Sequence, residues 1–422
     1  MEYEVRLMVN DILGSRLRVN GFQMQATIKT FQSNTGDCIF FLLQDGERKY
    51  NMMIDCGEYT TATAIREYVE NQLGKQIDLL IITHIDADHI PGIEQMLKET
   101  PDLNIGKIIF NSYERQQGQP ETPLTPIQKQ QIESIKGELN CVFRDAIENE
   151  VSARQAVTGL SKLIASNPLW RAKWERGYTT LDARKEIDLN EWGVIKILAP
   201  TLREIKKLDE EFRSLLFNEL FVEDDNVELS DCETLYEILI RYAELHANES
   251  AEDRQIASET LEERLQSAAE ENPKESSITP ANKASLAFVW EKDGKRVLFL
   301  GDSKPGIVVK GLLAHYPQGP FPMIFEAIKV AHHGSHYNTT ESLTEHVDSE
   351  HYFITGGEEG MRPSEAALGR ILLRDLSGNV RKRTLHVNYK TNLVEQLAKD
   401  QDLQERYHFD VDFDLNQHEF TL

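Results

Sequence analysis

A short polar segment in the first quarter of the chain carries four side chains that can bind metals. His84, Asp86, Asp88 and His89 follow the pattern H-x-D-x-D-H, directly after the apolar run Leu79–Ile82. Imidazole suits zinc and other transition metals, whereas carboxylates favour harder ions such as manganese or magnesium. His and Asp are also common in solvated loops, but four of them at this spacing after a strand-like run favour a metal site.

Two later segments repeat this arrangement of an apolar run followed by potential ligands. Asp302 follows Val297–Gly301, and the histidines at 332 and 333 follow Ala327–Ala331. Taken alone, Asp302 would be interpreted as a turn residue. Because sheet-based enzymes place their functional side chains where strands end, the three segments together predict one composite site.

The surrounding sequence predicts the strands and helices that must position these segments. Alternating residues over Gln25–Cys56 predict a meander of short strands. Other apolar runs predict further strands at Asp78–Thr83, Gly106–Asn111, Gly193–Leu198, Ala284–Trp290, Arg296–Leu300, Ala327–Ala331 and His351–Gly356. Amphipathic spacing predicts helices at Thr60–Leu73, Ile93–Glu99 and Ser364–Leu376.

Residues 116–280 differ from the sequence on either side. They are rich in Glu, Gln, Lys, Leu and Ala at helical spacing, which predicts a mostly helical acidic insertion around the strand Gly193–Leu198. We therefore divide the chain into residues 1–115, the insertion 116–280, and residues 281–422, which end in a short β-rich tail.

Composition excludes some classes of protein. The net charge is −24, but residues 209–275 alone hold 21 acidic and 5 basic residues, so the overall acidity says little against a polyanionic substrate at the site itself. The four cysteines lack C-x-x-C spacing, which excludes a zinc knuckle. No apolar run approaches the roughly 20 residues needed to cross a bilayer, and Met1–Leu13 lacks a signal-peptide core, so we expect a cytoplasmic protein with no membrane partner.

These motifs resemble those of the metallo-β-lactamase superfamily, particularly the branch of the DNA-uptake competence proteins and related stand-alone metallohydrolases. That branch carries H-x-D-x-D-H-x-x-G, here His84–Gly92, and K-V-x-H-H-G-S, here Lys329–Ser335. It also has N-x-x-S before a hairpin that ends in L-x-G-D. The corresponding residues here are Asn282, Ser285 and Leu300-Gly301-Asp302, and Gly36-Asp37 and Asp55–Gly57 fit as well. The resemblance covers about residues 25–111 and 282–376, and the segment between has no counterpart.

The resemblance implies an α/β fold, an αββα metallo-β-lactamase sandwich with one or two divalent metal ions, Zn²⁺ or Mn²⁺, at the sheet edges. One ion would be held by Asp88, His89, Asp302 and either His332 or His333, and the other by His84 and Asp86 with Asp302 bridging. We favour His332 as the ligand because it comes first after the strand, which leaves His333 to support it or to contact the substrate.

Catalytic roles follow from this ligand set. A divalent ion lowers the pKa of bound water towards about 7. Asp88 would orient that water or accept its proton, and His333 or His336 would protonate the leaving group. Ser335 and the backbone at Gly334 would donate to a phosphoryl or carbonyl oxygen. For His336, a role as an ordinary loop residue is as well supported as a catalytic one.

The chain departs from the superfamily pattern at three places. Asp86 stands where a histidine is usual. The superfamily also has a further metal-binding histidine on a later loop, but the only histidine between His89 and Asp302 is His246. Asn111 is therefore the nearest polar candidate for that position. This makes one site either weak, oxygen-rich and better suited to manganese than to zinc, or empty. Arg362, before Pro363, replaces a His-Pro; it would bind a phosphate bidentately or be a surface arginine.

The leading hypothesis is a metal-dependent phosphodiesterase or nuclease whose substrate is a nucleic acid or a nucleotide. The alternative is a hydrolase of an amide, a lactone or a thioester, a reaction that the same water-activating site could perform. A third hypothesis is an interaction protein that docks a protein partner on the acidic helical insertion and has a degenerate metal site, although acidic helices are more often simply solvated.

Overall fold

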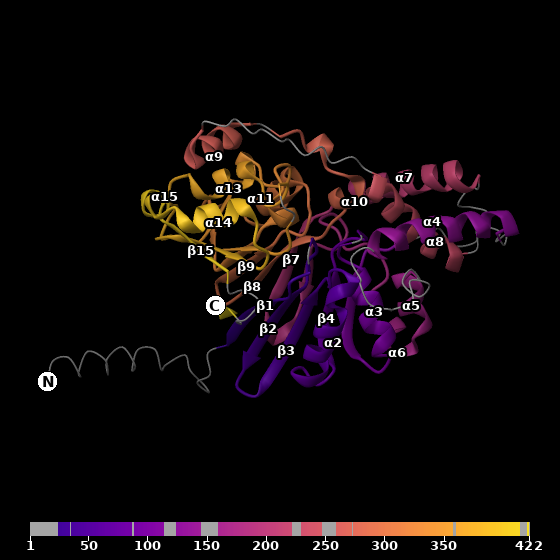
Figure 1. Cartoon of the computed structure of the whole chain (residues 1–422). Coiled ribbons are helices and arrows are strands. Elements are labelled where there is room, and N and C mark those ends of the chain that lie inside the picture. The colour runs from indigo at the N-terminus through magenta and orange to yellow at the C-terminus, as the bar shows by residue number, and fades with distance from the viewer. Residues whose placement is uncertain are drawn as a thin grey trace.

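The computed structural model describes residues 24–33, 35–86, 88–113, 124–144, 159–221, 229–246, 259–271, 273–357, 360–413 and 420–421. Within these residues the chain forms two large sheets that pack face to face, with helices on the outer side of each sheet (Figure 1). The αββα arrangement expected from the resemblance is confirmed.

The first sheet has the strand order β16-β1-β2-β3-β4-β5. Its strands are β1 (Gln25–Thr30), β2 (Ile39–Asp45), β3 (Arg48–Ile54), β4 (Gln76–Ile82), β5 (Asn104–Phe110) and β16 (Phe420–Thr421). The first three strands along the chain pair antiparallel, as the predicted meander requires, whereas β3, β4 and β5 run parallel.

The second sheet has the order β15-β14-β13-β11-β9-β8-β7-β6. Its strands are β6 (Glu186–Asp188), β7 (Val194–Ala199), β8 (Ala287–Lys292), β9 (Lys295–Phe299), β11 (Ala327–Lys329), β13 (His351–Ile354), β14 (Arg383–Val387) and β15 (Phe409–Asp412). The strands from β9 through β15 run parallel to one another. A separate parallel pair joins β10 (Met323–Phe325) to β12 (Val347–Ser349).

Helices cover both outer faces. Those against the first sheet are α2 (Ala62–Asn71), α3 (Pro91–Glu99), α4 (Pro126–Arg144), α5 (Leu160–Ser166), α6 (Pro168–Arg171), α7 (Leu202–Leu220), α8 (Leu229–His246) and α10 (Pro280–Lys283). Those against the second are α9 (Leu261–Glu270), α11 (Pro305–His315), α12 (Glu341–Thr344), α13 (Glu365–Leu372), α14 (Asn392–Lys399) and α15 (Gln401–Tyr407). A third apolar core, which includes Phe41, Trp290 and Phe299, fills the space between the sheets.

Two parts of the chain differ from the expected organisation. Residues 116–280 contain β6 besides the predicted strand Gly193–Leu198, which is β7, and β7 pairs directly with β8 in the second sheet. The predicted insertion is thus two helical stretches separated by strands of the sandwich. The tail is not simply β-rich, because α14 and α15 lie between β14 and β15. No helix in the described ranges is both long and apolar enough to span a membrane.

Candidate metal centre

The predicted ligands meet because the strands that precede them run parallel and end at one edge of the sandwich. β9 and β13 flank β11 in the second sheet, so the segments after them, which carry Asp302, His333 and Thr355, come together. In the first sheet β3 and β4 bring Asp55 and His84 to the same region. The carboxyl ends of parallel strands are where such sheets place their sites.

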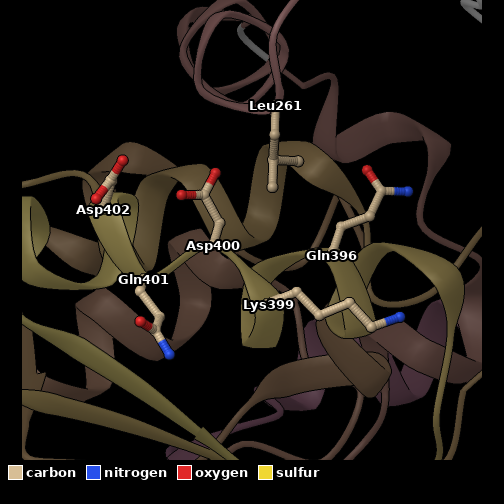
Figure 2. Close-up of a pocket in the computed structure, with 6 residues that line it drawn as sticks. All are labelled: Leu261, Gln396, Lys399, Asp400, Gln401 and Asp402. Atoms are coloured by element: carbon tan, nitrogen blue, oxygen red, sulfur yellow. The ribbon is translucent and has the colours of Figure 1, made fainter.

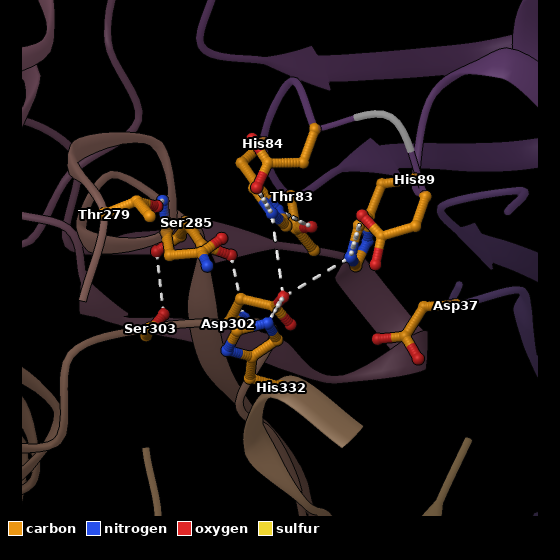
Figure 3. A network of polar contacts seen from close by, with 12 residues as sticks. Asp37, Thr83, His84, His89, Thr279, Ser285, Asp302, Ser303 and His332 are labelled. Atoms are coloured by element: carbon orange, nitrogen blue, oxygen red, sulfur yellow. Dashed lines mark hydrogen bonds and ion pairs between the residues drawn. The ribbon is translucent and has the colours of Figure 1, made fainter. Parts of the chain in front are cut away.

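Asp302 lies at the centre of this group (Figure 3). Its Oδ2 atom is 3.8 Å from Nε2 of His84, 3.5 Å from Nε2 of His89 and 3.6 Å from Nε2 of His332. The Asp302 side chain is 1% exposed, and its backbone N–H donates to Oγ of Ser285 at 3.0 Å. The resemblance had placed Asp302 between two metal positions, and its contacts with histidines of two separate motifs fit that placement.

Two further carboxylates approach the same histidines. Oδ2 of Asp86 lies 3.4 Å from Nε2 of His84. Asp88 lies between two rings, with Oδ1 3.6 Å from Nε2 of His89 and Oδ2 3.3 Å from Nε2 of His333. Its side chain is 21% exposed, more than any other member of the group, so Asp88 faces the solvent side of the centre.

Hydrogen bonds on the far side of the rings orient His84 and His89. Nδ1 of His89 donates to the Asp55 carboxylate at 2.8 Å. The Thr83 hydroxyl donates to Asp55 at 2.6 Å, so its oxygen accepts from Nδ1 of His84 at 2.9 Å. With the proton held on Nδ1, each Nε2 presents its lone pair to the centre, as a metal-ligating histidine must.

His332 and His333 differ in what their Nε2 atoms meet. Nδ1 of His333 donates to the Thr355 carbonyl at 2.5 Å, and its Nε2 has no hydrogen-bond partner. Nδ1 of His332 is bonded to Oδ1 of Asn338 at 3.1 Å, and its Nε2 accepts from the Arg362 guanidinium at 2.8 Å. Both backbones are left-handed, with φ of 46° and 54°, a conformation that costs energy for non-glycine residues. The geometry therefore favours His333 over our expected His332 as the metal ligand.

Asp37 enters the group from the loop before β2. One ligand atom from each of Asp37, His89, Asp302 and His333 lies within 4.8 Å of the others. The Asp37 carboxylate, however, already pairs with Lys329, accepts from the Thr355 hydroxyl, and lies 3.4 Å from Nδ1 of His333. It is thus placed to support His333 rather than to bind a metal.

The donor set fits a divalent metal. Among the described residues, five buried atoms of the centre lack a hydrogen-bond partner: Nε2 of His84, His89 and His333, and Oδ1 of Asp86 and Asp302. Leaving so many buried polar atoms unpaired costs free energy unless another group satisfies them. Imidazole nitrogens mixed with carboxylate oxygens match Zn²⁺ or Mn²⁺.

Charges at the centre favour a cation. Burial lowers the pKa of His333, but Asp37 and Asp88 outweigh burial and raise it to about 9. Burial also opposes charge on His89, yet Asp88 and Asp302 hold its pKa well above the ordinary value. Burial would raise the pKa of Asp302, but His332 and His89 hold it well below the usual range. A cluster that stabilises protonated imidazole also attracts metal ions, which displace those protons.

The remaining predicted residues lie around this centre. Ser335 is buried, and its Oγ accepts from the Tyr337 N–H at 3.3 Å, so it shapes the loop. His336 is half-buried and packs edge-on against Tyr337. The Arg362 guanidinium donates to Nε2 of His332, and this hydrogen bond places Arg362 beside the centre. Asn111 does not replace the missing loop histidine, because its amide bonds to the backbone of Thr179 at 2.8 and 2.9 Å.

Sequence reasoning missed the partners that orient the rings. Thr83, Asn338 and Thr355 carry no motif of their own, whereas Asp37 and Asp55 were noted only as part of the resemblance.

A separate surface pocket of about 560 Å³ lies over α14 and α15 and is lined by Leu261, Gln396, Lys399, Asp400, Gln401 and Asp402 (Figure 2). None of the predicted site residues lines that pocket.

Comparison with known proteins gives a partial match in sequence and distant matches in structure. Residues 16–101 match the family model described as Anti-Pycsar protein Apyc1, and no curated protein matches the chain. The metallo-β-lactamase fold protein YhfI from Bacillus subtilis is 10% identical, with 94% of this chain and 99% of YhfI covered and a TM-score of 0.34. The subclass B3 metallo-β-lactamase BJP-1 of Bradyrhizobium japonicum is 13% identical over 40% of this chain and 50% of its own, with a TM-score of 0.19.

The similarities to these solved structures are too distant to say anything about activity, and the resemblance to the competence branch stays a prediction. The fold rests on the sheets, the helical layers and the motif positions themselves. The chain is a metallo-β-lactamase-fold protein, because the loops that carry that superfamily's motifs meet at one edge of two facing sheets.

Proposed function

We propose that this protein is a metal-dependent hydrolase that cleaves a phosphodiester, with a cyclic nucleotide as its substrate class. The observation that carries the proposal is the convergence of buried, unpartnered nitrogen and oxygen atoms from three separate loops. The match of residues 16–101 to the Anti-Pycsar protein Apyc1 model supports the substrate class, since that match is consistent with a cyclic-nucleotide hydrolase. The oxygen-rich donor set favours a hard divalent ion, and such an ion polarises the phosphoryl oxygen of a phosphodiester.

We assign the ligands by the contacts of each side chain. Asp88, His89, Asp302 and His333 would hold one ion, and His84 and Asp86 would hold a second that shares Asp302. When bound, Zn²⁺ or Mn²⁺ lowers the pKa of water and polarises a phosphoryl oxygen. Asp55 and Thr83 keep the rings of the first-sheet histidines in the binding orientation.

Two residues of the chain would act on water and substrate. Asp88 is the most exposed carboxylate of the centre, and its pKa is held below the ordinary value because His89 and His333 outweigh burial. It therefore stays ionised at neutral pH and can orient the attacking water. The Arg362 guanidinium, fixed on Nε2 of His332, places a positive charge where a phosphate would approach.

His336 and Ser335 complete the proposed site. His336 follows the His332-His333 pair in the chain and is partly accessible, which supports a role in protonating the leaving oxygen. Ser335 would donate its hydroxyl hydrogen to a phosphoryl oxygen while its Oγ accepts from the Tyr337 N–H.

The test is metal analysis followed by hydrolysis assays with Mn²⁺ or Zn²⁺. The substrates are cyclic nucleotide monophosphates, bis-p-nitrophenyl phosphate, single-stranded DNA and a lactone, with His89→Ala and Asp302→Ala as inactive controls. We expect stoichiometric metal and hydrolysis of the cyclic nucleotides, abolished in both variants. Preferential cleavage of the lactone would support the alternative carbonyl hydrolase. A parent protein that binds no metal and resembles both variants on every substrate would contradict the proposal.

A further inference from the structure

We propose that Arg241, on the predicted helical insertion, is a positioning residue that holds the metal loop in its ligand-binding shape. The inference rests on the proposed function, because it assigns a role toward the metal that the loop is proposed to hold. The insertion would then be a working part of the centre and not an appendage to the sandwich.

The Arg241 side chain reaches from α8 to the metal loop. Its Nε donates to the backbone carbonyl of Ile85 at 3.2 Å, and its NH2 nitrogen donates to Oε1 of Glu94 at 3.1 Å. Arg241 is 2% exposed and the Glu94 side chain is 0% exposed, so both contacts lie in the interior. A buried guanidinium stays charged and is retained only where its partners are well placed.

The two contacts bracket three of the four ligands in the loop. Ile85 lies between His84 and Asp86, whereas Glu94 lies on α3, just after His89. The segment between the two contacts carries Asp86, Asp88 and His89. Arg241 therefore fixes both ends of the ligand-bearing segment with one rigid planar group.

The rest of the loop is held from other directions. The Thr83 carbonyl accepts from the Leu286 N–H at 3.0 Å, and the Asp86 carbonyl accepts from the His89 N–H at 3.2 Å. Leu286, the residue before β8, thus holds the start of the loop, and a hydrogen bond within the loop holds its end. Ile85 lies between the first two ligands, and its carbonyl accepts a hydrogen bond from Arg241 on α8.

α8 is itself anchored, which makes Arg241 a fixed donor. Glu237, one turn before Arg241, accepts from the Ser161 N–H at 2.8 Å at the start of α5. Oγ of Ser161 lies 2.6 Å from Oγ of Ser112, which follows β5 of the first sheet. A chain of buried polar contacts therefore connects α8 to the same sheet that carries the metal loop.

The test compares variants that separate loop positioning from helix stability. Arg241→Met combined with Glu94→Leu removes both members of the buried ion pair together. The other buried carboxylate near Arg241, Glu237, keeps its hydrogen bonds from the Leu160 and Ser161 N–H groups. Arg241→Lys keeps the charge opposite Glu94 but lacks the planar group that reaches two acceptors. Leu239→Ala is the control, because Leu239 is fully buried on α8 and its truncation weakens the helix packing without touching the Ile85 carbonyl. Circular dichroism establishes that each variant is folded.

The readouts are Mn²⁺ affinity by titration calorimetry and the visible spectrum of the Co²⁺-loaded protein. We expect the double variant and Arg241→Lys to bind Mn²⁺ about tenfold more weakly with altered Co²⁺ bands, and Leu239→Ala to retain both properties. Folded Arg241 variants with the parent's affinity and spectrum would overturn the inference, and so would an equal loss in Leu239→Ala. A parent that binds neither Mn²⁺ nor Co²⁺, which substitutes for Zn²⁺, would overturn the proposed function and this inference together.

Discussion

Lys329 and Asp37 form a buried ion pair that joins the two sheets beside the metal centre. Lys329 ends β11 in the second sheet, Asp37 precedes β2 in the first, and their side chains are 3% and 2% exposed. Asp37 also accepts from Thr355 and lies 3.4 Å from Nδ1 of His333. One carboxylate therefore connects the two halves of the sandwich and supports a proposed metal ligand.

We predict that Lys329→Met destabilises the protein by about 3–5 kcal/mol, because it leaves the Asp37 carboxylate buried without its cation. Lys382→Met is the control, since the side chains of Lys382 and its partner Asp410 are 50% and 47% exposed, and loss of an exposed pair costs about 1 kcal/mol or less. Urea unfolding curves measure both changes. Equal, small losses in the two variants would show that the Asp37 pair does not hold the sheets together.

The sequence was sufficient to predict the strand ends and their convergence. Apolar runs that stop at Thr83, Gly301 and Ala331 mark where strands leave the core, and parallel strands bring their ends together. The helices α2, α3 and α13 were also predicted from spacing, within four residues at each end, whereas α14 and α15 lie in a tail that was expected to be β-rich. The spacing of apolar residues records which face of a helix or strand is buried, so it can be recognised from the sequence alone.

Long-range and atomic details were not predictable. The Lys329–Asp37 bond spans 292 residues, and nothing local in either motif indicates it. His332 and His333 are identical side chains in adjacent positions, and only the folded backbone shows that Arg362 occupies Nε2 of one of them. Likewise β6 and β7 lie in a helix-rich segment, and their membership of the second sheet depends on pairing with β8.

We predict that His333→Gln lowers metal affinity at least tenfold, whereas His332→Gln lowers it less. Nε2 of His333 faces Asp88 without a hydrogen-bond partner, but Nε2 of His332 already accepts from Arg362. Removing His332 should instead free Arg362 to move and raise KM for a phosphodiester. Bound metal per chain, measured after dialysis against a weak chelator, distinguishes the two variants. Loss of metal in His332→Gln alone would reverse the ligand assignment.

Gly36 should tolerate no side chain. A Cβ atom placed there would lie 1.9 Å from the carbonyl oxygen of Asp88, so Gly36→Ala must displace the metal loop. We predict a loss of stability of about 1–3 kcal/mol and a loss of activity at least tenfold. Gly137→Ala is the matched control: its Cβ meets nothing within 4 Å on α4, and alanine there should stabilise the helix by about 0.5–1 kcal/mol. Unchanged activity in Gly36→Ala would contradict the close approach.

A histidine pair far from the metal loop along the chain should make stability depend on pH. His386 donates from Nδ1 to Asp412 at 2.8 Å, so its Nε2 accepts from Nδ1 of His351 at 3.1 Å. Burial and the neighbouring His386 lower the pKa of His351 to about 4, against 6.5 ordinarily, although Glu350 partly offsets them. The folded protein therefore holds His351 neutral where the unfolded chain would protonate it.

The sign of the effect follows from proton binding. Between pH 6.5 and 4 the unfolded chain binds more protons at His351 than the folded protein does, so stability falls as pH drops through this window and is unaffected by this group above it. Because the side chain is only partly buried, we expect solvent screening to limit the effect to about 1 kcal/mol. Urea unfolding of the parent and His351→Gln at pH 7.5, 6 and 4.5 measures the difference between them, which cancels the titration of other groups. Between pH 7.5 and 4.5 the free energy of unfolding should fall by about 1 kcal/mol more in the parent than in the variant. If the free energies of the two proteins change in parallel with pH, the His351–His386 contact does not resist protonation.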